Sequence, residues 1–70
     1  MDILYENSSI AVCIKPAGIS SQESGGRNMV NMLEETLGIA EIYPVHRLDI
    51  KTSGVMVYAK NKSAAAYLSK

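Results

Sequence analysis

The charged and ionisable side chains best placed for chemistry in this 70-residue chain are consecutive or nearly so, in the segment that begins at His46. Arg47 and Asp49 are two residues apart, so in an extended or loop backbone their side chains leave on the same side and can pair. A carboxylate held by a guanidinium stays ionised. Such an anion can serve as a nucleophile, as a general base, or as a stabiliser of positive charge at a sugar C1′.

An Arg-x-Asp pattern also occurs in loops that have no catalytic role, where the pair is a structural salt bridge. Thr52, Ser53 and Gly54 follow Asp49, and residues of these types can close a loop by hydrogen bonds and let the backbone turn into a strand. Many inert loops contain the same residues. Residue types and spacing therefore leave two interpretations open, a reactive carboxylate and an ion pair that stabilises the loop.

Three apolar runs predict the strands that would hold this loop. The first two, Ile3–Tyr5 and Ile10–Ile14, are separated by Asn and Ser residues that favour turns, so they predict a hairpin. The second run is apolar at every position, which predicts a strand inside a sheet and covered on both faces. The third run, Val55–Ala59, follows the loop directly. Catalytic residues are often found on loops that a rigid scaffold positions in this way.

A first helix is predicted after the hairpin. Apolar residues recur at helical spacing from Met29 to Leu37, Asn28 can cap the start of the helix, and Gly38 suits its end. These signals indicate a helix that lies on the sheet.

The alanine-rich segment 64–68 predicts a second, short helix with Asn61 or Ser63 as its N-cap. Residues 20–28 contain no apolar side chain, which predicts an exposed connecting loop. We therefore expect an α+β fold. Its sheet is mainly antiparallel, built from the N-terminal hairpin and the strand after the loop, and it carries one or two short helices.

The charges are unevenly distributed although the net charge is zero at pH 7. Residues 1–45 contain two basic and six acidic side chains, a balance of minus four, and residues 46–70 contain five basic and one acidic, a balance of plus four. The basic half contains the loop, which favours a polyanion such as nucleic acid as partner. Lysines on a solvated strand end and helix face explain the charge equally well.

Cys13 is the only cysteine and His46 the only histidine, so neither an internal disulfide nor a Cys/His zinc cluster can form. The apolar surroundings of Cys13 predict a buried, unreactive thiol in a reducing compartment. The chain has no secretory leader and no apolar run near the roughly 18 residues that a membrane span needs. We expect a soluble, cytoplasmic protein with no metal site.

From His46 to Gly54 the loop resembles, at every specified position, the H-R-L-D-x-x-T-S-G signature of the RluA-type RNA pseudouridine synthases. Upstream, Lys15-Pro16-Ala17-Gly18 is similar to the Lys-Pro-Ala/Ser-Gly turn that follows the first hairpin in that family. Ala59-Lys60 fits the Ala-Lys that often follows the family's strand. One departure is Ile14, where the family commonly has Asn. The resemblance implies that the fold is part of the larger pseudouridine synthase catalytic fold.

The resemblance implies isomerisation of uridine to pseudouridine in ribosomal or transfer RNA, without a metal or redox cofactor. In this reaction the N1 glycosidic bond breaks, the uracil turns over, and its C5 bonds to C1′. Asp49 matches the family's essential aspartate, which attacks C1′ or removes the 2′ proton, and the sequence leaves both routes open. Arg47 matches the arginine that pairs with this aspartate and helps to hold the target nucleotide out of the stack.

Further positions take expected roles from the same resemblance. His46 and Lys15 are expected to lie near the RNA. For Lys15 two interpretations are open, a position beside an RNA phosphate and a plain turn lysine. Four signature residues are expected to shape and support the loop, with the leucine as its hydrophobic anchor: Leu48, Thr52, Ser53 and Gly54.

Later motifs of the family, which supply a tyrosine and a second basic residue, are not found in these residues. We therefore expect residues 1–70 to be the N-terminal, incomplete portion of a pseudouridine synthase catalytic domain, inactive alone. Exposed sheet edges would favour self-association. The alternative is a non-catalytic RNA-binding or assembly module that keeps the basic loop for RNA or for a partner chain.

Overall fold

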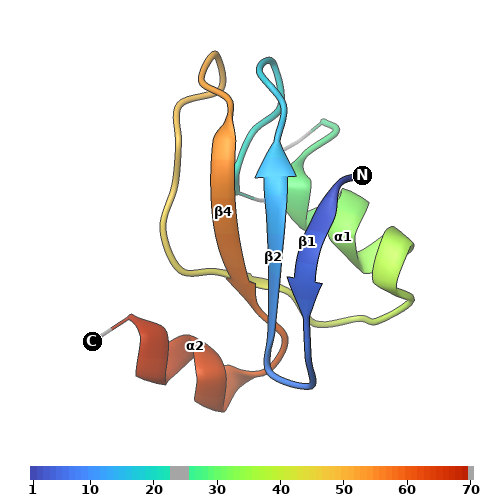
Figure 1. Cartoon of the computed structure of the whole chain (residues 1–70), viewed down its shortest axis with the longest axis vertical. Helices are drawn as coiled ribbons and strands as arrows, with labels where there is room; N and C mark the ends of the chain where they lie inside the picture. Colours follow the sequence, from blue (N-terminus) through green and yellow to red (C-terminus); the bar gives the residue numbers. More distant parts are fainter. Residues whose placement is uncertain (23–25, 70) are drawn as a thin grey trace.

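The computed structural model describes residues 1–22 and 26–69, and these residues form one sheet and two helices (Figure 1). The elements follow in the order β1 (Ile3–Glu6), β2 (Ile10–Lys15), α1 (Met29–Leu37), β3 (Tyr43–Pro44), β4 (Gly54–Ala59) and α2 (Lys62–Leu68). The strands are antiparallel and lie in the spatial order β1-β2-β4-β3. The predicted α+β class, with a mainly antiparallel sheet and short helices, is confirmed.

The pairing of β2 with β4 forms the centre of the sheet. It runs without interruption from Ile10 opposite Ala59 to Lys15 opposite Gly54. At the other edge of β2, the hairpin to β1 turns at Asn7, whose Oδ1 accepts hydrogen bonds from the backbone N–H groups of Ser9 and Ile10. The strand that follows the predicted site loop is therefore held directly against the N-terminal hairpin.

Helix α1 has the start and end that the sequence predicted. Asn28 is extended, with φ of −149°, and its side chain accepts a hydrogen bond from the Asn31 backbone N–H. Gly38 has φ of 68°, a left-handed conformation in which glycine is favoured, and its N–H donates to the carbonyl of Glu34. Figure 1 shows α1 behind the sheet. The core packs between them and consists of Cys13, Met29, Val30, Leu33, Ile42, Met56 and Tyr58.

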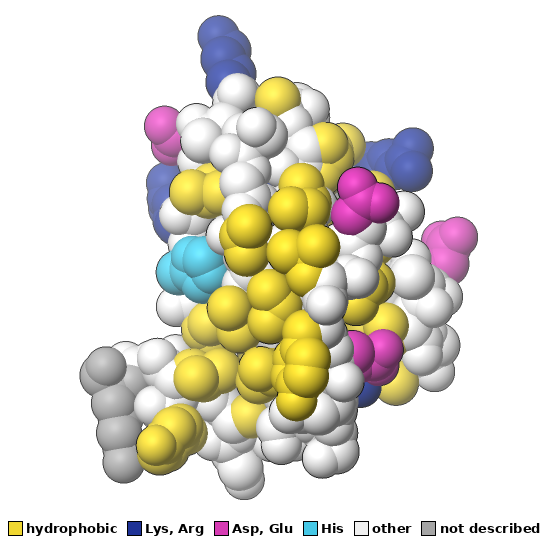
Figure 2. Space-filling view, in the orientation of Figure 1, with side chains coloured by type: hydrophobic (Ala, Val, Ile, Leu, Met, Phe, Trp, Pro, Cys, Tyr) yellow, Lys and Arg dark blue, Asp and Glu magenta, His cyan; other side chains and the backbone are white. Residues whose placement is uncertain are grey.

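The prediction that both faces of β2 are covered was wrong. Alternate residues of β2 are buried, and the residues between them, Ile10, Val12 and Ile14, are only half-buried. On the same face Leu4 is 57% exposed and Val55 is 56% exposed. Figure 2 shows hydrophobic side chains gathered on this side of the sheet, opposite α1. The strand is internal to the sheet, as its composition indicated. Within residues 1–22 and 26–69, α1 covers one face of the strand, and the other face is only partly covered.

The segment between β2 and α1 is less exposed than its composition predicted. Ser21 is 3% exposed and Asn28 is fully buried. Ser20 forms a single parallel bridge to Asn28, and its carbonyl accepts a hydrogen bond from the Met29 N–H. Residues 23–25, the centre of the predicted connecting loop, lie outside the described residues. The described ends of the segment are therefore part of the packed structure, because their polar groups find partners there.

Neither α1 nor α2 has the length and hydrophobicity that a membrane-spanning helix requires. In the described ranges, no three His, Cys, Asp or Glu side chains are grouped so that they could hold a metal ion.

Cys13 is fully buried, as predicted, and this burial makes the stability of the protein sensitive to alkaline pH. Burial raises the pKa of the thiol from its ordinary value of 9.0 to about 11, because the thiolate would lose its hydration. A pKa raised in the folded state gives a contribution to stability that is complete below pH 9 and is lost as the pH rises through 11.

We expect this effect to lower the free energy of unfolding by about 2 kcal/mol between neutral pH and pH 11. Urea unfolding at a series of pH values measures it. Burial also raises the pKa of Tyr58, which adds to the decline at the alkaline end. The Cys13→Ala protein shows the contribution of the thiol. Its free energy of unfolding should fall by about 2 kcal/mol less between neutral pH and pH 11 than that of the unsubstituted protein. An equal fall in both proteins would contradict the assignment.

Candidate functional site

The signature loop, residues 46–54, lies at the end of the sheet where β2 ends and β4 begins. Figure 1 shows the turn after β2 and the turn before β4 next to each other at this end. The two turns are joined by a hydrogen bond of 2.6 Å from the Gly18 N–H to the Ile50 carbonyl. Gly18 has φ of 91°, a left-handed conformation that residues with a side chain rarely adopt. The Lys-Pro-Ala-Gly turn is thus in direct contact with the loop that it precedes in sequence by some 30 residues.

Lys15 is fully buried at the base of the signature loop. Its Nζ donates to three backbone carbonyls, those of Pro16 at 3.0 Å, Ile50 at 3.2 Å and Thr52 at 2.6 Å. An ammonium group has three protons, so these bonds account for all of them. The expected contact between Lys15 and an RNA phosphate stays a prediction. What the structure shows is a buried cation that ties the signature loop to the end of β2.

Ser21 holds the loop at a second point. Its Oγ donates to the Leu48 carbonyl at 3.0 Å and accepts from the Leu48 N–H at 3.2 Å. Tyr58, which is fully buried on β4, donates from its hydroxyl to the Ser21 carbonyl at 2.6 Å. The Leu48 side chain packs against the core, and a Cβ atom on Gly54 would lie 3.1 Å from Leu48 Cδ1. The absence of a side chain at Gly54 therefore makes room for Leu48.

His46 holds the loop at a third point. Its Nε2 accepts a hydrogen bond of 3.0 Å from the Val57 N–H, so the neutral imidazole carries its proton on Nδ1. Strand β3 pairs with only two residues of β4, Ala59 and Tyr58, and the next residue along β4 is Val57. The His46 imidazole thus accepts a hydrogen bond from the β4 residue next to those that pair with β3. The rest of the ring is exposed, and the expected approach of His46 to RNA stays a prediction.

Arg47 and Asp49 are both exposed and line the same shallow depression, which has a volume of about 270 Å³. The predicted salt bridge between them is not formed: within the described ranges, the only ion pair is that of Lys60 with Glu6. An exposed ion pair gains at most about 1 kcal/mol, too little to hold two solvated side chains together. The remaining lining residues are Ser20, Ser21, Gln22, Leu48 and Ile50.

The end of the loop, at Thr52 and Ser53, supports this site through its backbone. Thr52 and Ser53 have exposed side chains, whereas the Thr52 N–H donates to the Asp49 carbonyl at 3.0 Å and its carbonyl accepts from Lys15. The backbone of Asp49 is therefore fixed in a turn while its carboxylate faces solvent. Such an arrangement offers an anion and a guanidinium to a polar ligand from one side, but the open depression does not exclude water, which weakens electrostatic stabilisation.

Sequence reasoning missed Ser21 and Tyr58. Ser21 lies in a segment without apolar residues, and Tyr58 lies in an apolar run where it resembles any core residue. One weak signal was available, because a tyrosine in a buried strand needs a partner for its hydroxyl group. The sequence did not indicate which partner.

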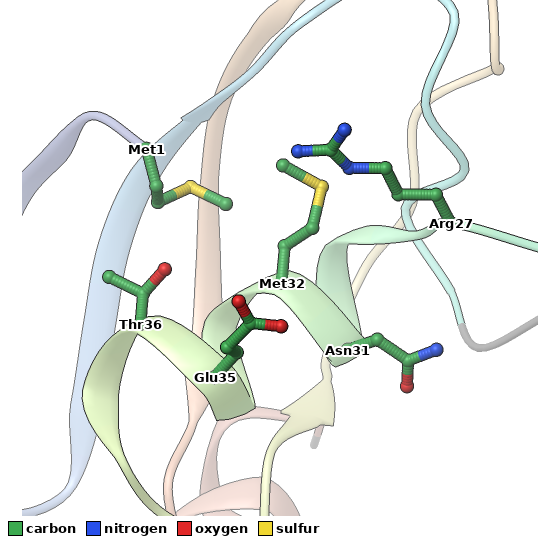
Figure 3. A pocket seen from close by; sticks show the side chains of 6 residues that line it. All are labelled: Met1, Arg27, Asn31, Met32, Glu35 and Thr36. Carbon is green, nitrogen blue, oxygen red and sulfur yellow. The ribbon is translucent and has the colours of Figure 1, made fainter.

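A second depression, of about 350 Å³, lies on the outer side of α1 (Figure 3). None of its lining residues belongs to the signature loop, so it does not share the chemistry of the candidate site. These residues are Met1, Arg27, Asn31, Met32, Glu35 and Thr36.

Comparison with known proteins gives a consistent result. The family model described as RNA pseudouridylate synthase matches residues 9–70. An uncharacterized RNA pseudouridine synthase of Mycoplasma pneumoniae is 40% identical over 100% of this chain and 24% of its own length. The dual-specificity RNA pseudouridine synthase RluA of Vibrio vulnificus is 43% identical over 99% of this chain and 28% of its own length.

A solved structure agrees with these relatives. Human RNA pseudouridylate synthase domain containing 4 superimposes with a TM-score of 0.76 at 28% sequence identity, over 96% of this chain and 27% of the human chain. The chain spans about a quarter of the length of the relatives that it matches.

The Lys15 contacts lead to a stability prediction. Lys15→Met keeps most of the side-chain volume but leaves the partly buried loop carbonyls of Ile50 and Thr52 without this donor, so we expect the free energy of unfolding to fall by roughly 1–3 kcal/mol. Lys62 is exposed and serves as the matched control, because Lys62→Met should change stability by less than about 0.5 kcal/mol. Urea unfolding of the three proteins measures both values, and equal effects at the two positions would refute the bracing role of Lys15.

Proposed function

Because the chain belongs to the RNA pseudouridylate synthase family, we propose that it carries the catalytic loop of an enzyme that isomerises uridine to pseudouridine in RNA. The observation that carries the proposal is the signature loop, whose backbone is fixed to the sheet while Asp49 and Arg47 face one depression. Pseudouridine is an isomer of uridine, so the reaction conserves atoms and electrons and consumes no redox cofactor.

Asp49 is the proposed catalytic residue. In one route its carboxylate attacks C1′ as N1 departs with the electron pair of the glycosidic bond. C5 of the detached uracil then attacks C1′ as the Asp49–C1′ bond breaks, and the proton lost from C5 is balanced by one gained at N1. In the other route the carboxylate removes the 2′ proton as the N1–C1′ bond breaks, which gives a glycal, and the proton returns to C2′ when C5 bonds to C1′. Both routes need an exposed, ionised carboxylate at a fixed position. The exposure of Asp49 and the backbone turn that holds it support this role.

Arg47 and His46 are the proposed direct RNA contacts, and Lys15, which is fully buried, is proposed to act on the RNA through its charge. Arg47 lines the depression beside Asp49, where it can hold a nucleotide that has left the stack. The exposed side of His46 is directed away from its bond to β4. Lys15 has no carboxylate within ion-pair distance among the described residues, so its buried charge adds positive potential beneath the loop and favours phosphate.

We also propose that residues 1–70 form the N-terminal portion of the catalytic domain and do not modify RNA by themselves. The share of its relatives that the chain spans, and the open depression around Asp49, support this view. Ribosomal or transfer RNA in the cytoplasm is the proposed substrate. One relative, from Buchnera aphidicola, is named ribosomal large subunit pseudouridine synthase D, and it is 38% identical over 87% of this chain and 22% of its own length.

A second candidate function is that of a non-catalytic RNA-binding or assembly module. The exposed apolar face of the sheet favours it, because a face that carries Leu4, Val55 and half-buried Val12 is suited to contact another chain. In this case the basic loop would bind RNA without acting on it.

Substitution of Asp49 tests the catalytic proposal. The protein as its gene encodes it, with any sequence that follows Lys70, is incubated with unmodified cellular RNA, and pseudouridines are mapped by chemical labelling. We expect Asp49→Asn to lower the rate at least about 100-fold, because the amide can neither attack C1′ nor accept the 2′ proton.

Asp2→Asn is the matched control for this experiment, since Asp2 is an exposed aspartate far from the loop in sequence. Its activity should equal that of the unsubstituted protein. Equal modification by the Asp49→Asn protein would refute the catalytic role, and RNA binding without any modification in every variant would favour the second candidate function.

The exposed sheet face leads to a prediction of self-association. We expect sedimentation equilibrium of the isolated chain to give an average mass above 7.6 kDa that rises with concentration. Val55→Lys, which places a charge on the apolar face, should shift the mass towards the monomer, whereas Glu35→Lys on α1 should not. A monomer at every concentration would exclude self-association.

A further inference from the structure

Two residues that belong to neither the signature loop nor the Lys-Pro-Ala-Gly turn determine how Asp49 is held. Ser21 Oγ bonds to both backbone polar groups of Leu48, at 3.0 Å to the carbonyl and 3.2 Å to the N–H. The Leu48 N–H belongs to the peptide unit shared with Arg47, and the Leu48 carbonyl belongs to the unit shared with Asp49. A single hydroxyl group therefore fixes the two peptide units that lead to the two charged residues of the site.

Water competes little for these bonds. Ser21 is only 3% exposed, although it lines the depression, so its hydroxyl is directed into the protein. A hydroxyl has one proton to donate and lone pairs to accept with, which matches the pair of bonds to Leu48. These partly buried bonds are costly to lose, because each loss leaves a Leu48 backbone group without its Ser21 partner. The Leu48 backbone is consequently restrained from both sides.

Ser21 is itself anchored to the sheet by Tyr58. The Tyr58 hydroxyl donates to the Ser21 carbonyl at 2.6 Å, and its ring lies in the core cluster on β4. A phenol is protonated at neutral pH, so the Tyr58 hydroxyl has a proton to donate, and burial raises its pKa further. The result is a hydrogen-bond chain from β4 through Tyr58 and Ser21 to the Leu48 backbone.

From this geometry we propose that Ser21 and Tyr58 are positioning residues for Asp49, which they orient through the Leu48 backbone without touching the substrate. The inference rests on the proposed function, because it assigns a role in the same reaction. Their role differs from that of Lys15, which holds the distal half of the loop through Ile50 and Thr52. Ser21 thus restrains the residue before Asp49 in the sequence, and Lys15 restrains residues after it.

The consequence for catalysis is specific. A reacting group that shifts by about 1 Å can lose up to about 100-fold in rate, whereas contacts elsewhere on the RNA continue to supply binding. Loss of the Ser21 hydroxyl should thus lower kcat and leave KM nearly unchanged. Tyr58→Phe removes one bond one step further from Asp49, and its effect should be in the same direction but smaller.

The test uses the protein as its gene encodes it, with kcat and KM measured on an unmodified RNA substrate. We expect Ser21→Ala to lower kcat by roughly 10-fold to 100-fold, with KM changed by less than about threefold. Ser21→Thr retains the hydroxyl and should recover most of the loss. Ser63 and Tyr5 are exposed, and the matched controls Ser63→Ala and Tyr5→Phe should leave kcat unchanged.

Amide hydrogen exchange gives a second measurement that does not depend on activity. The Leu48 amide should be protected in the unsubstituted protein and should exchange faster in Ser21→Ala, while the α1 amides keep their protection. If the unsubstituted protein lacks activity but the Leu48 amide responds in this way, the proposed function fails and the hydrogen-bond chain stands. An unchanged kcat in Ser21→Ala, or Leu48 protection that survives the substitution, would overturn the inference.

Discussion

In the antiparallel pairing of β2 with β4, Lys15 lies directly opposite Gly54, the residue at which the signature loop enters the sheet. This register places the Lys15 ammonium beneath the loop, where its protons reach the Ile50 and Thr52 carbonyls. A shift of one residue would turn Lys15 to the other face of the sheet. Nearly every other feature of the site depends on this register, because the loop has no regular structure of its own between β3 and β4.

The residues that hold the signature loop differ from those that face the depression. Lys15, Ser21 and Tyr58 are buried, and they hold the loop or its support through backbone groups alone. The side chains of Arg47 and Asp49 are left without an ion-pair partner among the described residues and face the depression. Because main-chain bonds fix the loop, its charged side chains do not need to hold each other in place and remain available for a substrate.

Two surfaces of the described residues are open to solvent. The depression around Asp49 is shallow, and the sheet face opposite α1 exposes Leu4 and Val55. Both are consistent with a unit that spans about a quarter of its relatives, in which a larger fold can surround the loop. The electrostatic benefit of a fixed carboxylate grows when water is excluded, so covering of the depression would strengthen the proposed catalytic role of Asp49.

By itself the sequence determined the hairpin, the bounds of α1 and the identity of the signature loop. These depend on local signals: Asn28 and Gly38 cap a helix within their own turns, and the signature occupies nine consecutive residues. Only the tertiary structure decided that Lys15 is buried, that Arg47 and Asp49 do not pair, and that Ser21 and Tyr58 support the loop. The bonds from Lys15 to Thr52, from Ser21 to Leu48 and from Tyr58 to Ser21 span 27 to 37 residues of sequence, and a hydrogen bond over that distance leaves no periodic pattern in the residues between.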